Sequence, residues 1–424
     1  MSGLTAGYKN DARILARGEL KLFLRGVDPP SNADVLAHPP GYSILIAAIF
    51  SLFGESDFAL RLFQIFCDGL SVLFVFLIAF ELTTKRVAIV AGVLAALSPQ
   101  LSYNSLLLLP DSLSVLPILV AVYILIRLGS DSRRWLSMVV AGAMLGLSCW
   151  LRPNGLLLPL FIAVVVLFHF QKGMRLRIVA PLVCAALIII APLTIRNLVV
   201  FDRFVPISLG SGVTFIEGIA DYDSDGATAL PKTDMEVLQR ETQIYSRPDY
   251  GGSLYNPDGI ERERARVALG VAVIRPRPFW FVGVMIRRAA SMLRLERVPV
   301  IAGSSLALET NASIIGEPTF GSTLLRVPAV ILKAAQKLFI TAIMLPLALI
   351  GLLILFKKQR SRVLVFLTVV PVYFLCIQSL LHTEYRYVLA IQYILVVFAA
   401  VAVNFIAKAA RRRAIELKGE AADL

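Results

Sequence analysis

Charged side chains recur beside the apolar segments of this chain, at places where an unpaired charge is costly. Asp111 begins one such segment, Arg152 separates two of them, and Arg386 precedes the last. A carboxylate can accept a proton from a hydroxyl or an amine, and guanidinium groups can hold a phosphate and stabilise the charge that builds on it. These residue types therefore suit proton transfer beside a bound phosphate.

Each of these residues also has a purely structural explanation. Asp111 follows a proline and could cap the start of a helix. Arg152 could anchor a helix end at a membrane interface, and Arg386 could pair with Glu384 in the same turn. The choice between chemistry and structure depends on whether the elements that carry these residues bring them together.

Composition identifies those elements as membrane helices. The 424 residues are 57% hydrophobic and have a mean hydropathy of +0.76, which is typical of a polytopic membrane protein. The net charge is +13, but the basic residues cluster at the ends of apolar runs, as contact with anionic lipid and the positive-inside bias require, so no nucleic-acid partner is expected. The four cysteines lie within apolar runs and are interpreted as packing residues.

The apolar runs predict an all-α integral membrane protein, a multi-spanning helix bundle with interfacial helices and a long extracytoplasmic loop. Its expected regions are an extracytoplasmic interfacial segment (1–57), a first bundle of about six crossings (58–195), an extracytoplasmic loop region (196–329), about three further crossings (330–407) and a cytoplasmic tail (408–424). An amphipathic helix is predicted from Tyr8 to Leu24. Short basic loops such as Lys85-Arg86 place the cytoplasm on one side, so the candidate residues fall on the other.

Two motifs resemble a known family. The stretch His38-Pro39-Pro40-Gly41 opens a short apolar run, and APLTIRNLVVFDRF, which contains Arg196-Asn197, matches a Pro-Trp-Thr-Ile-Arg-Asn motif with Leu193 in place of Trp. Together they resemble membrane glycosyltransferases of the GT-C fold that use a polyprenyl-phosphate sugar, relatives of the protein O-mannosyltransferases and aminoarabinose transferases of glycosyltransferase family 39. The resemblance extends from Tyr8 to about Ala407 and is weakest between Ala220 and Tyr255.

The resemblance implies a general base in the first or second outer segment. Family members carry an acid where Asp111 lies. Their other acid usually stands about four residues before the position of Tyr8, and that position is Leu4 here. Asp11 could substitute for it, or could be a solvated helix residue. Asp111 and Asp11 are therefore the candidate catalytic residues.

The resemblance also implies a lipid-phosphate site. Relatives have His or Lys before Pro-Pro, an Arg-Pro turn, the Arg-Asn motif, and an Arg-Tyr pair before the final helix. The residues that match, and are expected to bind the substrate or its phosphate, are His38, Arg152, Arg196, Asn197, Arg386 and Tyr387. A lone histidine is more often structural, and Arg152 could equally be an interface anchor.

The function implied is inverting transfer of a sugar from a polyprenyl-phosphate carrier to an acceptor glycan, lipid or protein at the outer face of a bacterial inner membrane. Membrane lipids are the other expected partners. Two alternatives remain: a non-catalytic or degenerate subunit, because the helix that precedes this region in the family is missing, and a lipid or sugar transporter, although no internal repeat is seen. The sugar and the acceptor are not specified by the sequence.

A cofactor is not certain from the sequence, and a divalent cation stays open. Asp221 to Gly226 copies the first half of a calcium-binding loop, but the twelfth position is Lys232 where a glutamate is needed. An acidic surface turn is the simpler interpretation, so no metal-binding residue is predicted.

Overall fold

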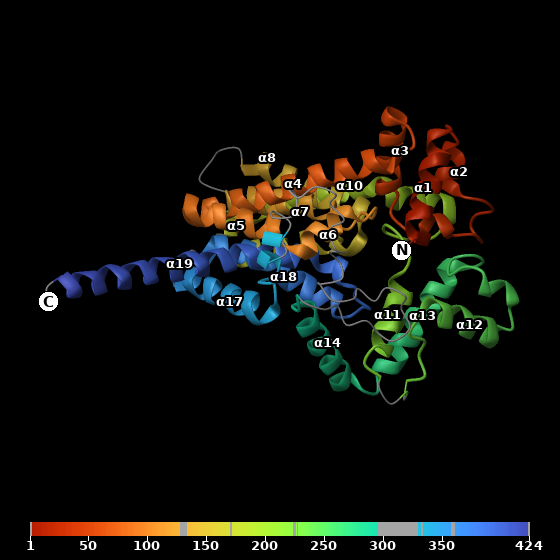
Figure 1. Cartoon of the computed structure of the whole chain (residues 1–424). Coiled ribbons are helices and arrows are strands. Elements are labelled where there is room, and N and C mark those ends of the chain that lie inside the picture. The colour runs from red at the N-terminus through yellow and green to blue at the C-terminus, as the bar shows by residue number, and fades with distance from the viewer. Residues whose placement is uncertain are drawn as a thin grey trace.

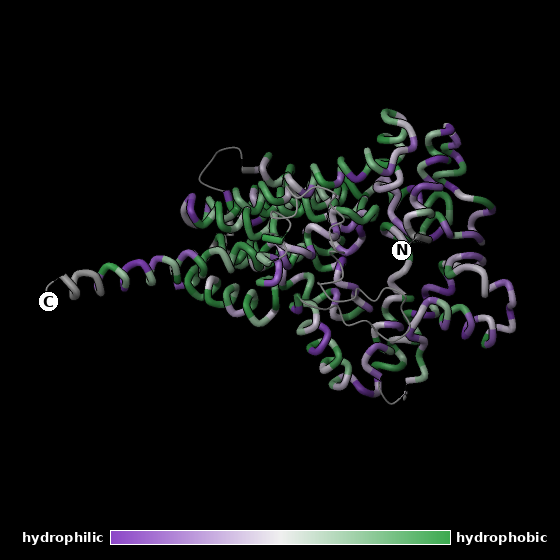
Figure 2. Tube along the Cα trace, in the orientation of Figure 1, coloured by the Kyte–Doolittle hydropathy of each residue, from purple (hydrophilic) through white to green (hydrophobic). Residues whose placement is uncertain are grey.

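The computed structural model describes residues 2–127, 134–169, 172–223, 226, 228–295, 330–331, 334–357 and 361–422. The described residues form α-helices and short 3-10 turns and contain no strand, which confirms the predicted fold class. Most of the apolar helices run side by side in one bundle, and two smaller groups of helices lie at one end of it (Figure 1). Figure 2 shows that the bundle is mainly hydrophobic and that these end groups are more polar.

The first end group is formed by α1 (Ser2–Ala16), α2 (Leu20–Arg25) and α3 (Gly41–Phe53). The single helix predicted from Tyr8 to Leu24 is wrong, because Gly18 has φ +79° and separates α1 from α2. Helix α3 starts after Pro40, as the Pro-Pro signal predicts. Its first residue, Gly41, lies against the backbone carbonyl of Trp150, so closely that a Cβ at this position would overlap it.

The main bundle begins with helices that follow one another closely along the chain. They are α4 (Asp57–Leu82), α5 (Lys85–Leu97), α6 (Pro99–Leu106), α7 (Val115–Ile126), α8 (Arg134–Leu151), α9 (Leu158–His169) and α10 (Lys172–Phe201). Gly142 and Gly146 of α8 face the carbonyls of Leu182 and Ala186 in α10, where no side chain would fit. Small residues of this kind let two membrane helices approach closely.

The C-terminal helices complete the bundle. They are α17 (Thr341–Lys357), α18 (Ser361–Gln378) and α19 (Leu389–Ala422), and a 3-10 turn, Tyr385–Val388, precedes α19. One continuous apolar core joins buried residues of α4, α5, α7, α8, α9 and α10 to those of α17, α18 and α19. Helix α19 has 34 residues, longer than the ~20 that cross a bilayer, and its charged end projects beyond the bundle (Figures 1 and 2).

The second end group, called the lobe below, contains α11 (Ser211–Ala220), α12 (Asp234–Tyr245), α13 (Gly259–Ile274) and α14 (Pro278–Met292). Within the expected loop region, helical patterns at 260–274 and 279–295 predict α13 and α14, and no such pattern predicts α11 and α12. Buried ion pairs join α12 to α13: Glu241 of α12 lies 2.6 Å from Arg262 and 2.7 Å from Arg266, both on α13. A buried carboxylate shared by two guanidinium groups keeps its charge compensated and fixes α12 on α13.

Three of the described helices are long and apolar enough to cross a membrane: Asp57–Leu82, Arg175–Phe201 and Tyr385–Glu416. Two bent helix pairs, α5 with α6 and α13 with α14, raise this number to five if each is one span. The bend between α5 and α6 is 53° and falls at Ser98-Pro99, where proline interrupts the helical hydrogen bonds. Several apolar helices, among them α7 and α9, are shorter than a typical span.

Candidate functional site

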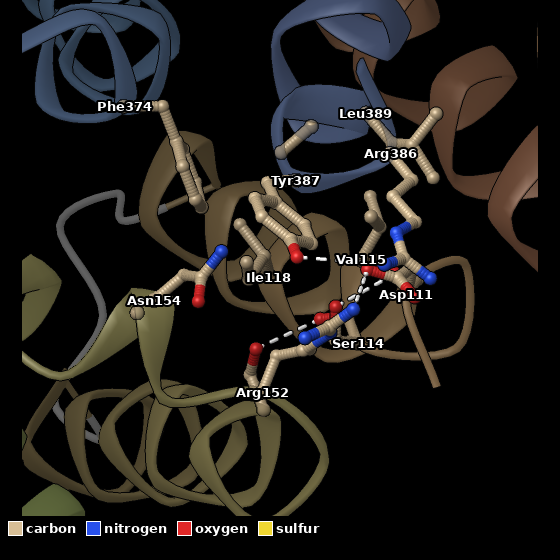
Figure 3. Close-up of a pocket in the computed structure, with 13 residues that line it drawn as sticks. Asp111, Ser114, Val115, Ile118, Arg152, Asn154, Phe374, Arg386, Tyr387 and Leu389 are labelled. Carbon is tan, nitrogen blue, oxygen red and sulfur yellow. Dashed lines mark hydrogen bonds and ion pairs between the residues drawn. The ribbon is translucent and has the colours of Figure 1, made fainter. Parts of the chain in front are cut away.

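A pocket lies in the main bundle, where the stretch leading into α7, the end of α8, α18 and the turn before α19 meet. It is lined by polar residues (Asp111, Ser114, Ser148, Arg152, Asn154, Arg386 and Tyr387) and by apolar ones (Val115, Ile118, Gly155, Phe374, Leu389 and Ala390). Figure 3 shows that the guanidinium groups of Arg152 and Arg386 both point toward Asp111 beside the Tyr387 ring.

Asp111 is held in the turn between α6 and α7. Its carboxylate is 4% exposed, and Oδ1 lies 2.5 Å from Nη2 of Arg152. The Ser114 hydroxyl donates to the Asp111 carbonyl at 2.7 Å, and the Ser148 hydroxyl donates to the Ser114 carbonyl at 2.8 Å. Asp111 is therefore not the N-cap of α7, and its buried carboxylate faces a cation.

Arg386 enters the pocket from the turn before α19. Its Nε lies 2.7 Å from Oε2 of Glu384, so the pairing predicted as its structural role does occur. The Tyr387 ring lies beside both pocket arginines, with its centroid 4.7 Å from Cζ of Arg152 and 5.3 Å from Cζ of Arg386. An aromatic face attracts cations, so Tyr387 helps to keep two guanidinium groups in one buried site.

Three buried groups in the pocket region lack hydrogen-bond partners. Within the described residues, Nη1 of Arg386, Nε of Arg152 and both carboxylate oxygens of Asp111 make no hydrogen bond, although Asp111 and Arg152 are in ionic contact. Buried polar groups are normally paired, so unpaired donors and acceptors need an explanation. An anion that also carries hydrogen-bond donors, such as a phosphorylated sugar, would pair both kinds of group.

Tyr8 of α1 and His38, just before α3, form an aromatic wall of the first end group, which does not line the pocket but lies within electrostatic range of its charges. Their ring centroids are 5.0 Å apart, and the Tyr8 ring also meets Tyr42 edge to face at 5.1 Å. Burial raises the pKa of Tyr8 to about 12, and Arg152 and Asp111 lie within electrostatic range of it. Burial, with the charges of Arg152 and Arg386, lowers the pKa of His38 to about 4. His38 is therefore a neutral imidazole at pH 7.

We expect the pKa of His38 to shape the acid stability of the protein. The unfolded chain protonates this residue near its ordinary value of 6.5 and the folded chain only near 4, so the unfolded state binds more protons between these values. The free energy of unfolding therefore falls as the pH drops through this window. His38→Gln should flatten the dependence of Tm on pH between about 6.5 and 4, measured by thermal unfolding in detergent.

His382 provides a control of opposite sign. Burial acts to lower its pKa, but the hydrogen bond and charge of Asp221 outweigh burial and raise it above 6.5. Its stabilising contribution is complete below the unfolded pKa and is lost as the pH rises through the folded one. His382→Gln should therefore lose stability mainly at acid pH. Equal slopes for wild type and His38→Gln would contradict the environment described for His38.

The structure places Asp11 away from the pocket arginines. It lies on α1, one turn after Tyr8, and its carboxylate is 3.5 Å from the Ser43 hydroxyl. Burial raises the pKa of Asp11 to about 6, and neither pocket arginine contributes to the shift. Of the two predicted bases, only Asp111 is thus brought beside Arg152.

Arg196 and Asn197 also lie outside the group that lines the pocket. The Arg196 guanidinium donates to the Asn197 side-chain oxygen at 2.6 Å. Asn197 in turn donates to the carbonyls of Val205 at 2.8 Å and Ile207 at 2.9 Å. These contacts fold the chain back after α10, so a role in shaping the turn accounts for the Arg-Asn motif in this structure.

The sequence reasoning missed Ser114, Ser148 and Asn154 as pocket residues. Ser114 lies three residues after Asp111, and Asn154 lies two residues after Arg152. Ser148 lies on α8, one helical turn before Arg152. Proximity along a turn or a helix was the available signal. Tyr8 entered the sequence analysis only as a spacing marker, and its contact with His38 depends on the packing of α1 on α3.

The half-matching calcium loop does not form a metal site in the described residues. Asp221 lies 2.9 Å from Nδ1 of His382 and 3.5 Å from Nη2 of Arg288, and Asp223 accepts hydrogen bonds from Thr228. Ser224 and Asp225 lie outside the described residues. In the part of the chain that the structure describes, no group of three or more His, Cys, Asp or Glu side chains could hold a metal ion.

Residues 37–195 match the model of a family described as dolichyl-phosphate-mannose-protein mannosyltransferase. The matched segment includes His38, Asp111 and Arg152. A search of curated proteins gave no match to the chain. The family match agrees, over that segment, with the resemblance stated from the sequence.

One solved structure supports a shared fold, and a second shows a weaker similarity. The archaeal oligosaccharyltransferase AglB from Archaeoglobus fulgidus, in complex with an inhibitory peptide and a dolichol-phosphate, matches 97% of this chain at 14% identity with a TM-score of 0.52. The chain spans 48% of that structure's length. ArnT from Cupriavidus metallidurans bound to undecaprenyl phosphate matches 87% of this chain and 68% of its own, at 16% identity and a TM-score of 0.36.

Proposed function

We propose that this protein transfers a sugar from a polyprenyl-phosphate carrier to an acceptor hydroxyl or amine at the extracytoplasmic face of the membrane. The observation that carries the proposal is that Arg386, Arg152 and Asp111 line one pocket and that, among the described residues, Nη1 of Arg386, Nε of Arg152 and Oδ2 of Asp111 have no hydrogen-bond partner. The family match over residues 37–195 supports a lipid-linked sugar as the donor. AglB, whose fold this chain shares, was solved in complex with a dolichol-phosphate.

The two pocket arginines are assigned to the donor phosphate. In the structure, Arg152 is in contact with Asp111 and Arg386 with Glu384. A phosphate brings negative charge and several acceptor oxygens, and guanidinium groups bind such groups with charge-assisted hydrogen bonds. We infer that the phosphate draws Arg152 toward itself, which leaves the Asp111 carboxylate free to act as a base.

The reaction then proceeds as a single displacement. The acceptor oxygen or nitrogen attacks the anomeric carbon of the sugar and forms the new glycosidic bond, while its proton passes to Asp111. The bond between the anomeric carbon and the phosphate oxygen breaks, and its electron pair leaves with the polyprenyl phosphate. Arg152 and Arg386 stabilise the charge that builds on that oxygen. One displacement at one carbon inverts its configuration.

The apolar wall of the pocket suits the lipid part of the donor. Phe374, Leu389 and Ala390 come from α18 and α19, and Val115 and Ile118 come from α7. Together they connect the charged end of the pocket to the hydrophobic bundle, where an isoprenoid chain would be buried at low cost. The mixture of two arginines with this wall distinguishes a lipid phosphate from a soluble one.

Identifying the lipid that purifies with the protein tests the proposal. Organic extraction followed by mass spectrometry should release a polyprenyl phosphate or its sugar derivative from wild-type protein. The protein reconstituted with that lipid should then form a glycosylated product whose anomeric configuration is opposite to that of the donor. A phospholipid-only extract together with no transfer from any polyprenyl-phosphate sugar would overturn the proposal.

In this mechanism Arg152 and Arg386 stabilise the charge on the leaving phosphate, so transfer should not require a divalent cation. Asp111 is the single carboxylate among the described residues that line the pocket, and one carboxylate is a poor cage for Mg²⁺ or Ca²⁺. We expect treatment with EDTA to change the transfer rate by less than about twofold. A loss of activity that Mg²⁺ or Mn²⁺ restores would show instead that a cation shares the work of Arg152 and Arg386.

A further inference from the structure

Gln64 is buried in α4, outside the pocket, and its side-chain hydrogen bonds go to the stretch that carries Asp111 and to Tyr42 of α3. Its Nε2 donates to the carbonyl of Leu107 at 2.8 Å and to that of Leu109 at 3.2 Å. Its Oε1 accepts from the Tyr42 hydroxyl at 3.0 Å. The side chain is 0% exposed, so water does not replace these bonds.

On one side, Gln64 holds the segment that carries the proposed base. Leu107 and Leu109 precede Asp111 by four and two residues, in the stretch between α6 and α7 that has no regular helix. The Ser148 hydroxyl fixes the far end of this stretch through the Ser114 carbonyl. Gln64 fixes its near end, so Asp111 lies between two anchored points.

On the other side, Gln64 holds the wall formed by Tyr8 and His38, through Tyr42. Gln64 accepts a hydrogen bond from the hydroxyl of Tyr42, which is fully buried. The Tyr42 ring meets the Tyr8 ring edge to face, with the two centroids 5.1 Å apart. Tyr8 in turn contacts the His38 ring at 5.0 Å. One amide group therefore connects the Asp111 segment to the Tyr8 and His38 wall, and its two ends fix the distance between them.

We propose that Gln64 is a positioning residue that sets the place of Asp111 relative to the wall formed by Tyr8 and His38. This inference rests on the proposed function, because it takes Asp111 as the base. It assigns Gln64 an effect on the rate of proton transfer and almost none on donor binding, because Gln64 contacts neither Arg152 nor Arg386. A displacement of about 1 Å at a reacting group can lower a rate by about a hundredfold.

Gln64→Met is the main variant, because methionine keeps the length of the side chain and removes both the donors and the acceptor. Gln100→Met is its matched control. Gln100 is also buried, and its amide donates to the carbonyl of Leu295 and not to the pocket segment. Tyr42→Phe removes only the bond to Oε1 and leaves those to Leu107 and Leu109 intact.

The first readout is steady-state transfer by the full chain in detergent or liposomes. Gln64→Met is expected to lower kcat by about tenfold to a hundredfold with the donor KM changed less than about threefold. Gln100→Met should keep the wild-type kcat, and Tyr42→Phe should lose less than Gln64→Met. A wild-type kcat in Gln64→Met, or an equal loss in Gln100→Met, would overturn the positioning role.

The second readout does not depend on sugar transfer. Hydrogen exchange followed by mass spectrometry should show the peptide that covers residues 107–114 exchanging about tenfold faster in Gln64→Met, as loss of buried hydrogen bonds predicts. Peptides from the lobe should exchange as in wild type. If exchange changes in this way but wild-type protein transfers no sugar, the proposed function fails and the structural role stands. Unchanged exchange in 107–114 overturns the role itself.

Discussion

Replacing Asp111 with asparagine is expected to reduce sugar transfer by about 10²-fold to 10⁴-fold, the usual contribution of a general base. Asparagine keeps the shape of the side chain but cannot take the acceptor proton. The change should appear in kcat rather than in the donor KM, because the pocket arginines that hold the phosphate remain. Initial rates at saturating donor, measured with radiolabelled or fluorescent acceptor, give the comparison.

Asp11→Asn is the matched control for this experiment. Asp11 is the other carboxylate that the sequence offers as a base, but it lies beside Ser43 and away from Arg152. We expect Asp11→Asn to keep a rate within about threefold of wild type, far below the effect of losing a base. If Asp11 were the base, its pKa of about 6 would appear as a rise of kcat through that pH, and Asp11→Asn would abolish the rise. That result would contradict the assignment of Asp111.

Arg386→Met should be the second most damaging change, with kcat/KM lowered by about 10²-fold to 10³-fold. Methionine fills most of the space of the arginine stem and removes the charge and every donor. Arg386→Lys should recover part of the loss, because a lysine restores the charge but not the planar fork that binds phosphate oxygens. Transfer assays with varied donor concentration separate the effects on kcat and KM.

The loss of Arg386 also frees Glu384, so folding must be checked. Thermal unfolding in detergent should show only a modest change, since Glu384 is partly exposed and can be hydrated. Arg196→Met is the control for removing a cation near the outer ends of the helices. Its contacts are with Asn197, so it should affect stability more than transfer. A larger loss of activity in Arg196→Met than in Arg386→Met would point to a different phosphate site.

The sequence was sufficient for much of the fold. The apolar runs 58–80, 112–126, 363–381 and the one that starts at Tyr387 predict α4, α7, α18 and the start of α19 to within three residues, because long stretches without charge have few other structures open to them in a membrane. The run 178–195 covers only the middle of α10. The sequence was not sufficient for the break at Gly18 or for helices α11 and α12. Helix α12 is polar and is stabilised by buried ion pairs such as Glu241 with Arg266, a partner that is distant in sequence. Helix α11 has only ten residues, too few to stand out as a membrane crossing.

For the site, sequence motifs pointed to candidate residues but did not separate those that line the pocket from those that stabilise a turn. Asp111, Arg152 and the Arg386-Tyr387 pair come from three separate segments and line one pocket, and His38 lies within electrostatic range of both arginines. Arg196 and Asn197 belong to the most specific motif, yet the structure shows them fixing a turn. A motif reports that a residue type is needed at a position, and only packing shows whether the need is chemical or structural.

Gln64 shows a limit of a different kind. A single glutamine within an apolar helix has no motif around it, and its value comes from partners 22, 43 and 45 residues away. Membrane helices seldom bury an amide without partners, since an unpaired one costs free energy. That rule marks Gln64 as a residue to examine, but the partners become visible only when α3, α4 and the stretch before α7 are seen together.

Equilibrium binding of undecaprenyl phosphate to purified protein tests the central claim most directly, because it requires neither the correct sugar nor the correct acceptor. We expect Arg386→Met and Arg152→Met each to weaken binding by about tenfold or more, the value of a charge-assisted hydrogen bond to phosphate. Arg196→Met should bind as wild type does. Equal affinities in all four proteins, or a loss confined to Arg196→Met, would contradict a lipid-phosphate site between Arg152 and Arg386.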